Sequence, residues 1–204
     1  MGLFNLFSKI VWKVKRSFIK KSDSRPWEYI IIHHSATRDD GERNDWEAIR
    51  RYHKAYAVNG NIVNKQEFTR MEQFTRTHNK NHYLKRPWDD IGYHYGIERS
   101  ENTLKVKEGR KLSKVGAHAY ILGNNNYNLY GIGVCLVGNF NAKEPDTEQF
   151  DMLVWIVKQL QLLYDIPTRH VLGHREVYTR EHREPTKSCP GAAFDMDKFR
   201  SRLV

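Results

Sequence analysis

The chain has 204 residues, of which 39% are hydrophobic and 28% are charged, and its formal net charge is +10. These values fit one globular domain with a substantial core, and two cysteines are too few for a scaffold held together by disulfide bonds. No apolar run reaches the roughly 18 residues of a membrane-spanning helix, so we predict no such helix. The charge predicts an anionic partner, and nucleic acid, an anionic membrane and a bacterial cell wall all fit that description.

Residues 1–21 form a basic segment that contains six cations and no acidic residue. At helical spacing its apolar side chains gather on one face, opposite Lys9, Lys13, Arg16 and Lys20. This pattern is typical of a helix that lies on an anionic membrane or outer envelope, and packing of its apolar face on the domain is the alternative. Lysines interrupt the apolar stretch and no small-residue cleavage site follows, so we predict no cleavable signal peptide.

The remaining pattern predicts a single α/β domain with a central mixed β-sheet flanked by helices. We place the N-terminal segment and its linker at 1–25 and the domain at 26–204. Strands are predicted at 29–32, 91–98, 104–106, 131–137 and 170–172. Helices are predicted from a cap at Asn44 or Asp45 to about residue 55, from a cap at Thr147 to residue 164, and after a cap at Asp195. Residues 57–87 are polar and indicate an insertion, with a short amphipathic helix around Phe68, Met71 and Phe74.

Candidate metal ligands lie where predicted strands end and loops begin, the places from which a scaffold directs functional side chains. His33 and His34 end the first strand, His174 follows the last strand, and Cys189 lies in a polar loop. Neutral imidazole and thiolate suit zinc, and three such ligands with an open fourth position form a catalytic zinc site. Adjacent strand residues point to opposite faces, so only one of the two neighbouring histidines should ligate. On spacing alone His182 could replace His174, and ordinary surface or core histidines remain the alternative.

Six short blocks follow one another along the chain. They are IHHSAT at 32–37, IGYHY at 91–95, VGAH at 115–118, Asn128 with GIGVCLVG at 131–138, GHRE at 173–176 and KSCPG at 187–191. In this order they resemble the type 2 N-acetylmuramoyl-L-alanine amidases, the zinc amidases of phage endolysins and bacterial autolysins, which are related to peptidoglycan recognition proteins. The resemblance covers about residues 27–204, apart from much of 57–87.

The resemblance implies one zinc ion held by His33, His174 and Cys189, with catalytic roles for Tyr93 and Lys187. It implies that the substrate is peptidoglycan, cut at the amide between N-acetylmuramic acid and L-alanine. The lysine would supply a cation to the developing oxyanion, and the phenol could donate to it or help move a proton. Which of the two groups moves the proton stays open at this stage.

Three further histidine and asparagine side chains, His118, Asn128 and His34, are predicted substrate contacts. We expect a phage or prophage endolysin that stays in the host cytoplasm until release to the cell wall, with membrane association through 1–21. We expect a monomer and no nucleic-acid partner. A peptidoglycan-binding module without catalysis and a basic membrane-active protein are the alternatives; the retained Cys189 favours an enzyme, because family members that only bind have lost this ligand.

Overall fold

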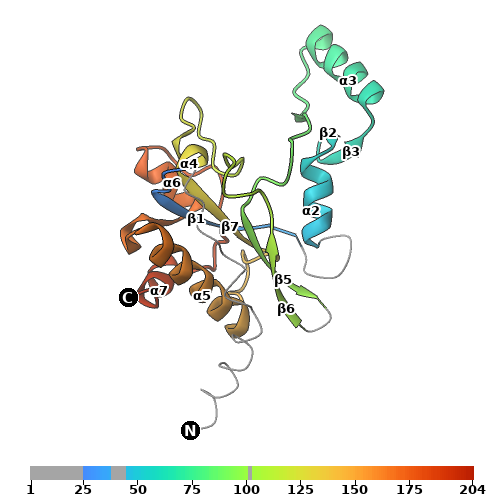
Figure 1. The fold of residues 1–204 in the computed structure, drawn as a ribbon. Coiled ribbons are helices and arrows are strands. Elements are labelled where there is room, and N and C mark those ends of the chain that lie inside the picture. Colours follow the sequence, from blue (N-terminus) through green and yellow to red (C-terminus); the bar gives the residue numbers. More distant parts are fainter. Residues whose placement is uncertain (1–24, 38–44, 101–102) are drawn as a thin grey trace.

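The computed structural model describes residues 25–37, 45–100 and 103–204, which form one α/β domain (Figure 1). The main sheet has five strands in the order β6-β5-β7-β1-β8. Their bounds are β1 (Tyr29–His34), β5 (Tyr95–Ser100), β6 (Thr103–Glu108), β7 (Gly131–Leu136) and β8 (Val171–Gly173). β6 is antiparallel to β5 and the other pairings are parallel, so the predicted mixed sheet is confirmed. The predicted basic helix, with Lys9, Lys13, Arg16 and Lys20, lies outside the described residues.

Helices cover both faces of this sheet. α5 (Thr147–Tyr164) and α7 (Met196–Ser201) pack on the face that carries Ile30 and Ile32 of β1. α4 (Asn126–Leu129) and α6 (His174–Arg180) pack on the opposite face against Ile31, and α2 (Trp46–His53) covers that face beside Cys135. Because side chains alternate along a strand, His33 shares the face of Ile31, where α2, α4 and α6 lie.

Two predicted boundaries are wrong. The strand predicted from residue 91 begins only at Tyr95, because the N–H of Ile91 donates to Asp90 and that of Gly92 donates to His53, which removes both donors from the ladder. The long helix is capped by Asp146 rather than Thr147, since the Asp146 carboxylate accepts from the N–H of Gln149.

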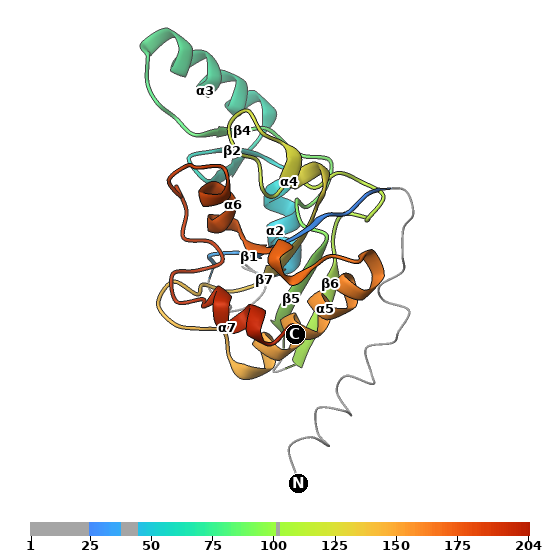
Figure 2. The ribbon, with the colours of Figure 1, turned by 90° about the vertical axis from the view of Figure 1, so that its left-hand side faces the viewer.

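Residues 56–85 form a separate small unit beside the main sheet. It contains β2 (Tyr56–Val58), β3 (Asn61–Val63), β4 (Leu84–Lys85) and α3 (Lys65–His78), and its three strands have the order β3-β2-β4. Figures 1 and 2 show α3 projecting from the body of the domain. The short helix predicted here is therefore a 14-residue helix, which buries Phe68. The hairpin of β2 and β3 was not predicted, although Asn59-Gly60 is a dipeptide typical of two-residue turns, and both residues have the positive φ that such a turn requires. That this unit is an insertion stays a prediction.

The chain ends through η1 (Thr168–His170), β8, α6 and α7, and α6 was not predicted. Its first residue is His174, and the Glu176 carboxylate accepts from the N–H of Gly173 at 2.7 Å, which stabilises the start of the helix. Among the described residues, no helix has the length and apolar character needed to cross a membrane.

Candidate metal centre

Three predicted ligands converge at the carboxyl end of β1. Ligand atoms of His33, His174 and Cys189 all lie within 4.8 Å of one another, and all three residues are buried. The parallel pairing of β1 with β8 places Ile32 opposite Gly173, so His33 and His174 each follow a paired position. Cys189 reaches the same place from the loop between α6 and α7. The sheet register thus brings together residues that lie more than a hundred positions apart.

The imidazole of His33 faces the thiol of Cys189 through one ring nitrogen. Its Nδ1 lies 3.6 Å from Cys189 Sγ, while its Nε2 lies 3.0 Å from Nδ1 of His118. Burial, followed by the nearby His174, His118 and Lys187, holds the pKa of His33 well below its usual range. A neutral ring with one free lone pair is the form that a metal ion requires.

His174 has a buried nitrogen without a partner. Its Nε2 makes no hydrogen bond with any described residue, and its ring centroid lies 4.6 Å from that of His33. Burial, and then the charge of Lys187, lowers its pKa to about 3. Buried polar atoms are nearly always paired, so this nitrogen marks a place where a cation fits.

Backbone N–H groups hold Cys189 at two points, its thiol and its carbonyl. Its Sγ accepts from the N–H of His34 at 3.4 Å, and its carbonyl accepts from the N–H of Arg175 at 2.7 Å. Burial raises the pKa of the thiol to about 12, although the His34 N–H, Lys187 and Arg175 oppose that shift. Binding of a metal ion would therefore have to release the thiol proton.

The two predicted catalytic residues both lie near this cluster. The ring centroid of Tyr93 is 5.0 Å from that of His33. Burial, and then Cys135 and Cys189, raises the pKa of Tyr93 well above 10, so its phenol keeps its proton. Lys187 is exposed, and its charge lowers the pKa of both His33 and His174, which places the ammonium near the cluster.

The three predicted substrate contacts are buried and bonded within the chain. His118 contacts His33, and Asn128 Oδ1 accepts from the N–H groups of His118 and Ala119 at 2.7 and 2.8 Å. His34 points to the opposite face, as expected, where its Nδ1 accepts from the N–H of Phe140. The structure thus gives all three side chains internal partners, and their contact with substrate stays a prediction. His182, the alternative to His174, is exposed.

One functional candidate was missed by the sequence analysis. The guanidinium of Arg175 donates to the carbonyl groups of Ser188, Gly191 and Phe194 at 3.1, 2.5 and 2.6 Å. It therefore fastens the loop that carries Cys189. Its position beside His174 in GHRE was the available signal, but the partners of a guanidinium cannot be read from sequence.

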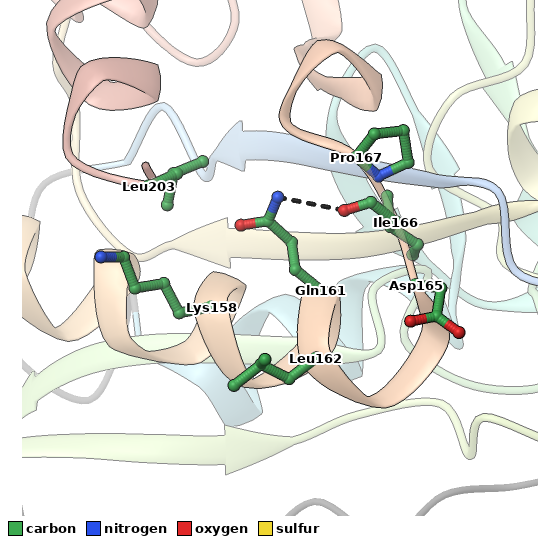
Figure 3. Close-up of a pocket in the computed structure, with 7 residues that line it drawn as sticks. All are labelled: Lys158, Gln161, Leu162, Asp165, Ile166, Pro167 and Leu203. Atoms are coloured by element: carbon green, nitrogen blue, oxygen red, sulfur yellow. Dashed lines mark hydrogen bonds between the residues drawn. The ribbon is translucent and has the colours of Figure 1, made fainter.

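A surface pocket elsewhere on the domain offers no comparable chemistry. It has a volume of about 420 Å³ and lies at the end of α5, where Gln161 donates to the carbonyl of Ile166 (Figure 3). None of the described residues that line it is a histidine or a cysteine. The cluster at the end of β1 is therefore the better candidate for a metal site.

Comparison with known proteins agrees with this arrangement. The sequence profile of the family Amidase_2, N-acetylmuramoyl-L-alanine amidase, matches residues 23–192. The endolysin of Enterobacteria phage K11 is 31% identical over 117 residues, which cover 55% of this chain and 65% of that protein. Peptidoglycan-recognition protein SD of Drosophila melanogaster is 39% identical over 97 residues, which cover 46% of each chain.

The aligned segments thus cover less than two thirds of these curated relatives. Among solved structures, N-acetylmuramoyl-L-alanine amidase LysC from Clostridium intestinale URNW has the same fold, with a TM-score of 0.53 and 19% identity over 93% of this chain and 94% of that chain. The family profile spans most of the domain, from the segment before β1 to the loop of Cys189. The chain belongs to the N-acetylmuramoyl-L-alanine amidase family.

Proposed function

We propose that this chain is a zinc-dependent endolysin that hydrolyses the amide between N-acetylmuramic acid and L-alanine in peptidoglycan. The observation that carries the proposal is the convergence of His33, His174 and Cys189 within 4.8 Å in a member of this family. The similarity to a phage endolysin supports a role in cell lysis, and the similarity to a peptidoglycan-recognition protein supports the same polymer as partner.

The residues fit one zinc ion. Two neutral imidazoles and a cysteine match the ligand set of a catalytic zinc site, and the unpaired Nε2 of His174 supplies an acceptor that needs a cation. A zinc ion bound there would polarise a carbonyl oxygen and make water acidic enough to lose a proton near pH 7. The fit rests on the donor set and on the burial of all three residues.

Lys187 and Tyr93 would act on the substrate from beside the metal. Exposed Lys187 can place its ammonium against the oxygen of the amide as negative charge develops there. Tyr93 keeps its phenolic proton because of its raised pKa, so it would act as a hydrogen-bond donor. Since Tyr93 is half-buried and keeps its proton, we assign proton movement to Lys187 or to solvent, and orientation of the carbonyl to Tyr93.

Digestion of purified cell walls tests the proposal. Wild-type protein should clear a wall suspension and release new free amino groups, and a chelator should abolish both effects until zinc is restored. Cys189→Ala should lose bound zinc and activity, whereas His182→Ala, which removes the exposed alternative ligand, should retain both. Full activity of Cys189→Ala would refute the zinc mechanism. Wall binding by the wild type without new amino groups would instead favour a binding module.

The basic segment is a separate part of the proposal. Six cations without an acid in residues 1–21 support contact with an anionic membrane or envelope. We expect the full chain to sediment with vesicles that contain anionic lipid and to remain in solution when Lys9, Lys13, Arg16 and Lys20 are all replaced by Gln. Equal sedimentation of both proteins would exclude this role.

A further inference from the structure

The ring nitrogen of His33 that faces away from Cys189 has a partner that the proposed function does not use. Nε2 of His33 lies 3.0 Å from Nδ1 of His118, and Nε2 of His118 lies 3.1 Å from the carbonyl oxygen of Gly131. His118 is 9% exposed and touches His33 edge to face, with 5.0 Å between ring centroids. We propose that His118 is a positioning residue that fixes the tautomer and orientation of His33 for the metal ion. This inference rests on the proposed function.

The direction of the hydrogen bonds follows from the last acceptor in this relay. A backbone carbonyl can only accept, so Nε2 of His118 must carry the hydrogen. In a neutral ring the other nitrogen is then an acceptor, so Nδ1 of His118 accepts from the Nε2–H of His33. Nδ1 of His33 is left with its lone pair directed at Cys189 Sγ. One backbone carbonyl thus determines which nitrogen of His33 faces the ligand cluster.

Two glycines make room for the His118 ring. A Cβ at Gly133 would lie 2.6 Å from Cδ2 of His118, and a Cβ at Gly116 would lie 2.5 Å from the same atom. Both distances are shorter than carbon atoms tolerate, so any side chain at either position would displace the imidazole. Neither glycine has a positive φ, so close approach of the ring, rather than backbone conformation, accounts for both.

The backbone of His118 is fixed as well. Asn128 Oδ1 accepts from the N–H groups of His118 and Ala119, and Asn128 Nδ2 donates to Asn125. Gly131, whose carbonyl ends the relay, opens β7, the strand that pairs with β1. The VGAH block, Asn128 and the GIG of β7 therefore form one support for His33. This account gives His118 and Asn128 a role that does not require contact with substrate.

Two nearly isosteric variants separate positioning from packing. His118→Asn places an amide oxygen near the position of Nδ1, where it can accept from His33, whereas His118→Leu offers no acceptor. Both variants lose the ring and the bond to Gly131. We expect Leu to weaken zinc binding by about 10- to 100-fold, as loss of such partners usually does, and Asn to recover most of that loss. The measurement is the zinc dissociation constant in competition with a chromophoric chelator.

Equal zinc affinities of the Leu and Asn variants, with both proteins folded by circular dichroism, would overturn the proposal. A second readout needs neither zinc nor activity. Nitrogen-15 NMR of histidine-labelled, metal-free wild-type protein should show the hydrogen of His33 on Nε2, and a hydrogen on Nδ1 would also overturn the proposal. Because the NMR result does not depend on hydrolysis, it tests the role of His118 independently of the amidase activity. A wild-type protein that binds no zinc would instead refute the proposed function.

Discussion

Replacing Arg175 by Lys should weaken zinc binding without touching any ligand. The Arg175 guanidinium donates to three carbonyls of the Cys189 loop, those of Ser188, Gly191 and Phe194. A lysine ammonium is a single point that cannot reach three divergent carbonyls, so we expect two of the three bonds to be lost. The loop should then sample conformations in which Cys189 leaves His33 and His174.

The magnitude follows from the bonds that are lost. Hydrogen bonds from a charged donor contribute about 1.5–3 kcal/mol each, and partial exposure of Arg175 puts these bonds at the lower end. The loss of two bonds should therefore raise the free energy of the ordered loop by about 3 kcal/mol relative to its other conformations. If the loop must become ordered again when zinc binds, this corresponds to roughly a 100-fold weaker zinc affinity, at 1.4 kcal/mol for each factor of ten.

The chain offers a matched control in Arg110. This half-buried guanidinium also donates to three carbonyls, those of Ile91, Val115 and Asp90, but it fastens the segment that carries Tyr93. Arg110→Lys should destabilise the protein to a similar extent and lower amidase activity, while zinc affinity falls clearly less than in Arg175→Lys, because Arg110 touches the support of His33 only through the carbonyl of Val115. Zinc competition titrations and denaturant unfolding of the metal-free proteins measure both quantities. Equal zinc affinities of the two variants would show that Arg175 does not hold the metal loop.

Three further predictions concern the interior of the domain. Burial lowers the pKa of His94 to about 3, so this histidine contributes its full stability above pH 6.5 and loses that contribution as pH falls from 6.5 toward 3. The free energy of unfolding of the metal-free protein should therefore fall by about 1.3 kcal/mol through this one group between pH 7 and 5.5. In urea unfolding, His94→Asn should remove this part of the dependence of stability on pH. Elsewhere in a strand, Gly→Ala would stabilise the protein by about 0.5–1 kcal/mol. Gly133→Ala should instead cost about 1–3 kcal/mol of stability and weaken zinc binding, because the new methyl group would collide with the ring of His118. A higher urea midpoint would contradict the view that Gly133 makes room for this ring. Lys85→Met should cost about 2–3 kcal/mol, because buried Lys85 donates to the carbonyls of Tyr52, His53 and Ala55 at the end of α2, and zinc affinity should not change.

Local patterns in the sequence predicted the mixed sheet and the end of β1 as a place for candidate metal ligands. The continuous apolar run before His33 predicts a central strand, and β1 is paired on both sides. Alternation along that strand predicts that His33 and His34 diverge, and His34 does face Phe140. These features depend on neighbours along the chain, which is why sequence alone determines them.

Only the tertiary structure decided what surrounds the ligands. The sequence suggested His118 and Asn128 as substrate contacts, and only the structure places the ring of His118 against His33 and the amide of Asn128 against the backbone of His118. Arg175 next to His174 gave no indication that it holds carbonyls on the far loop. A hydrogen bond needs a partner at about 3 Å, and the partner of His33, His118, lies in a loop 85 residues further along the chain that only the folded structure brings beside β1.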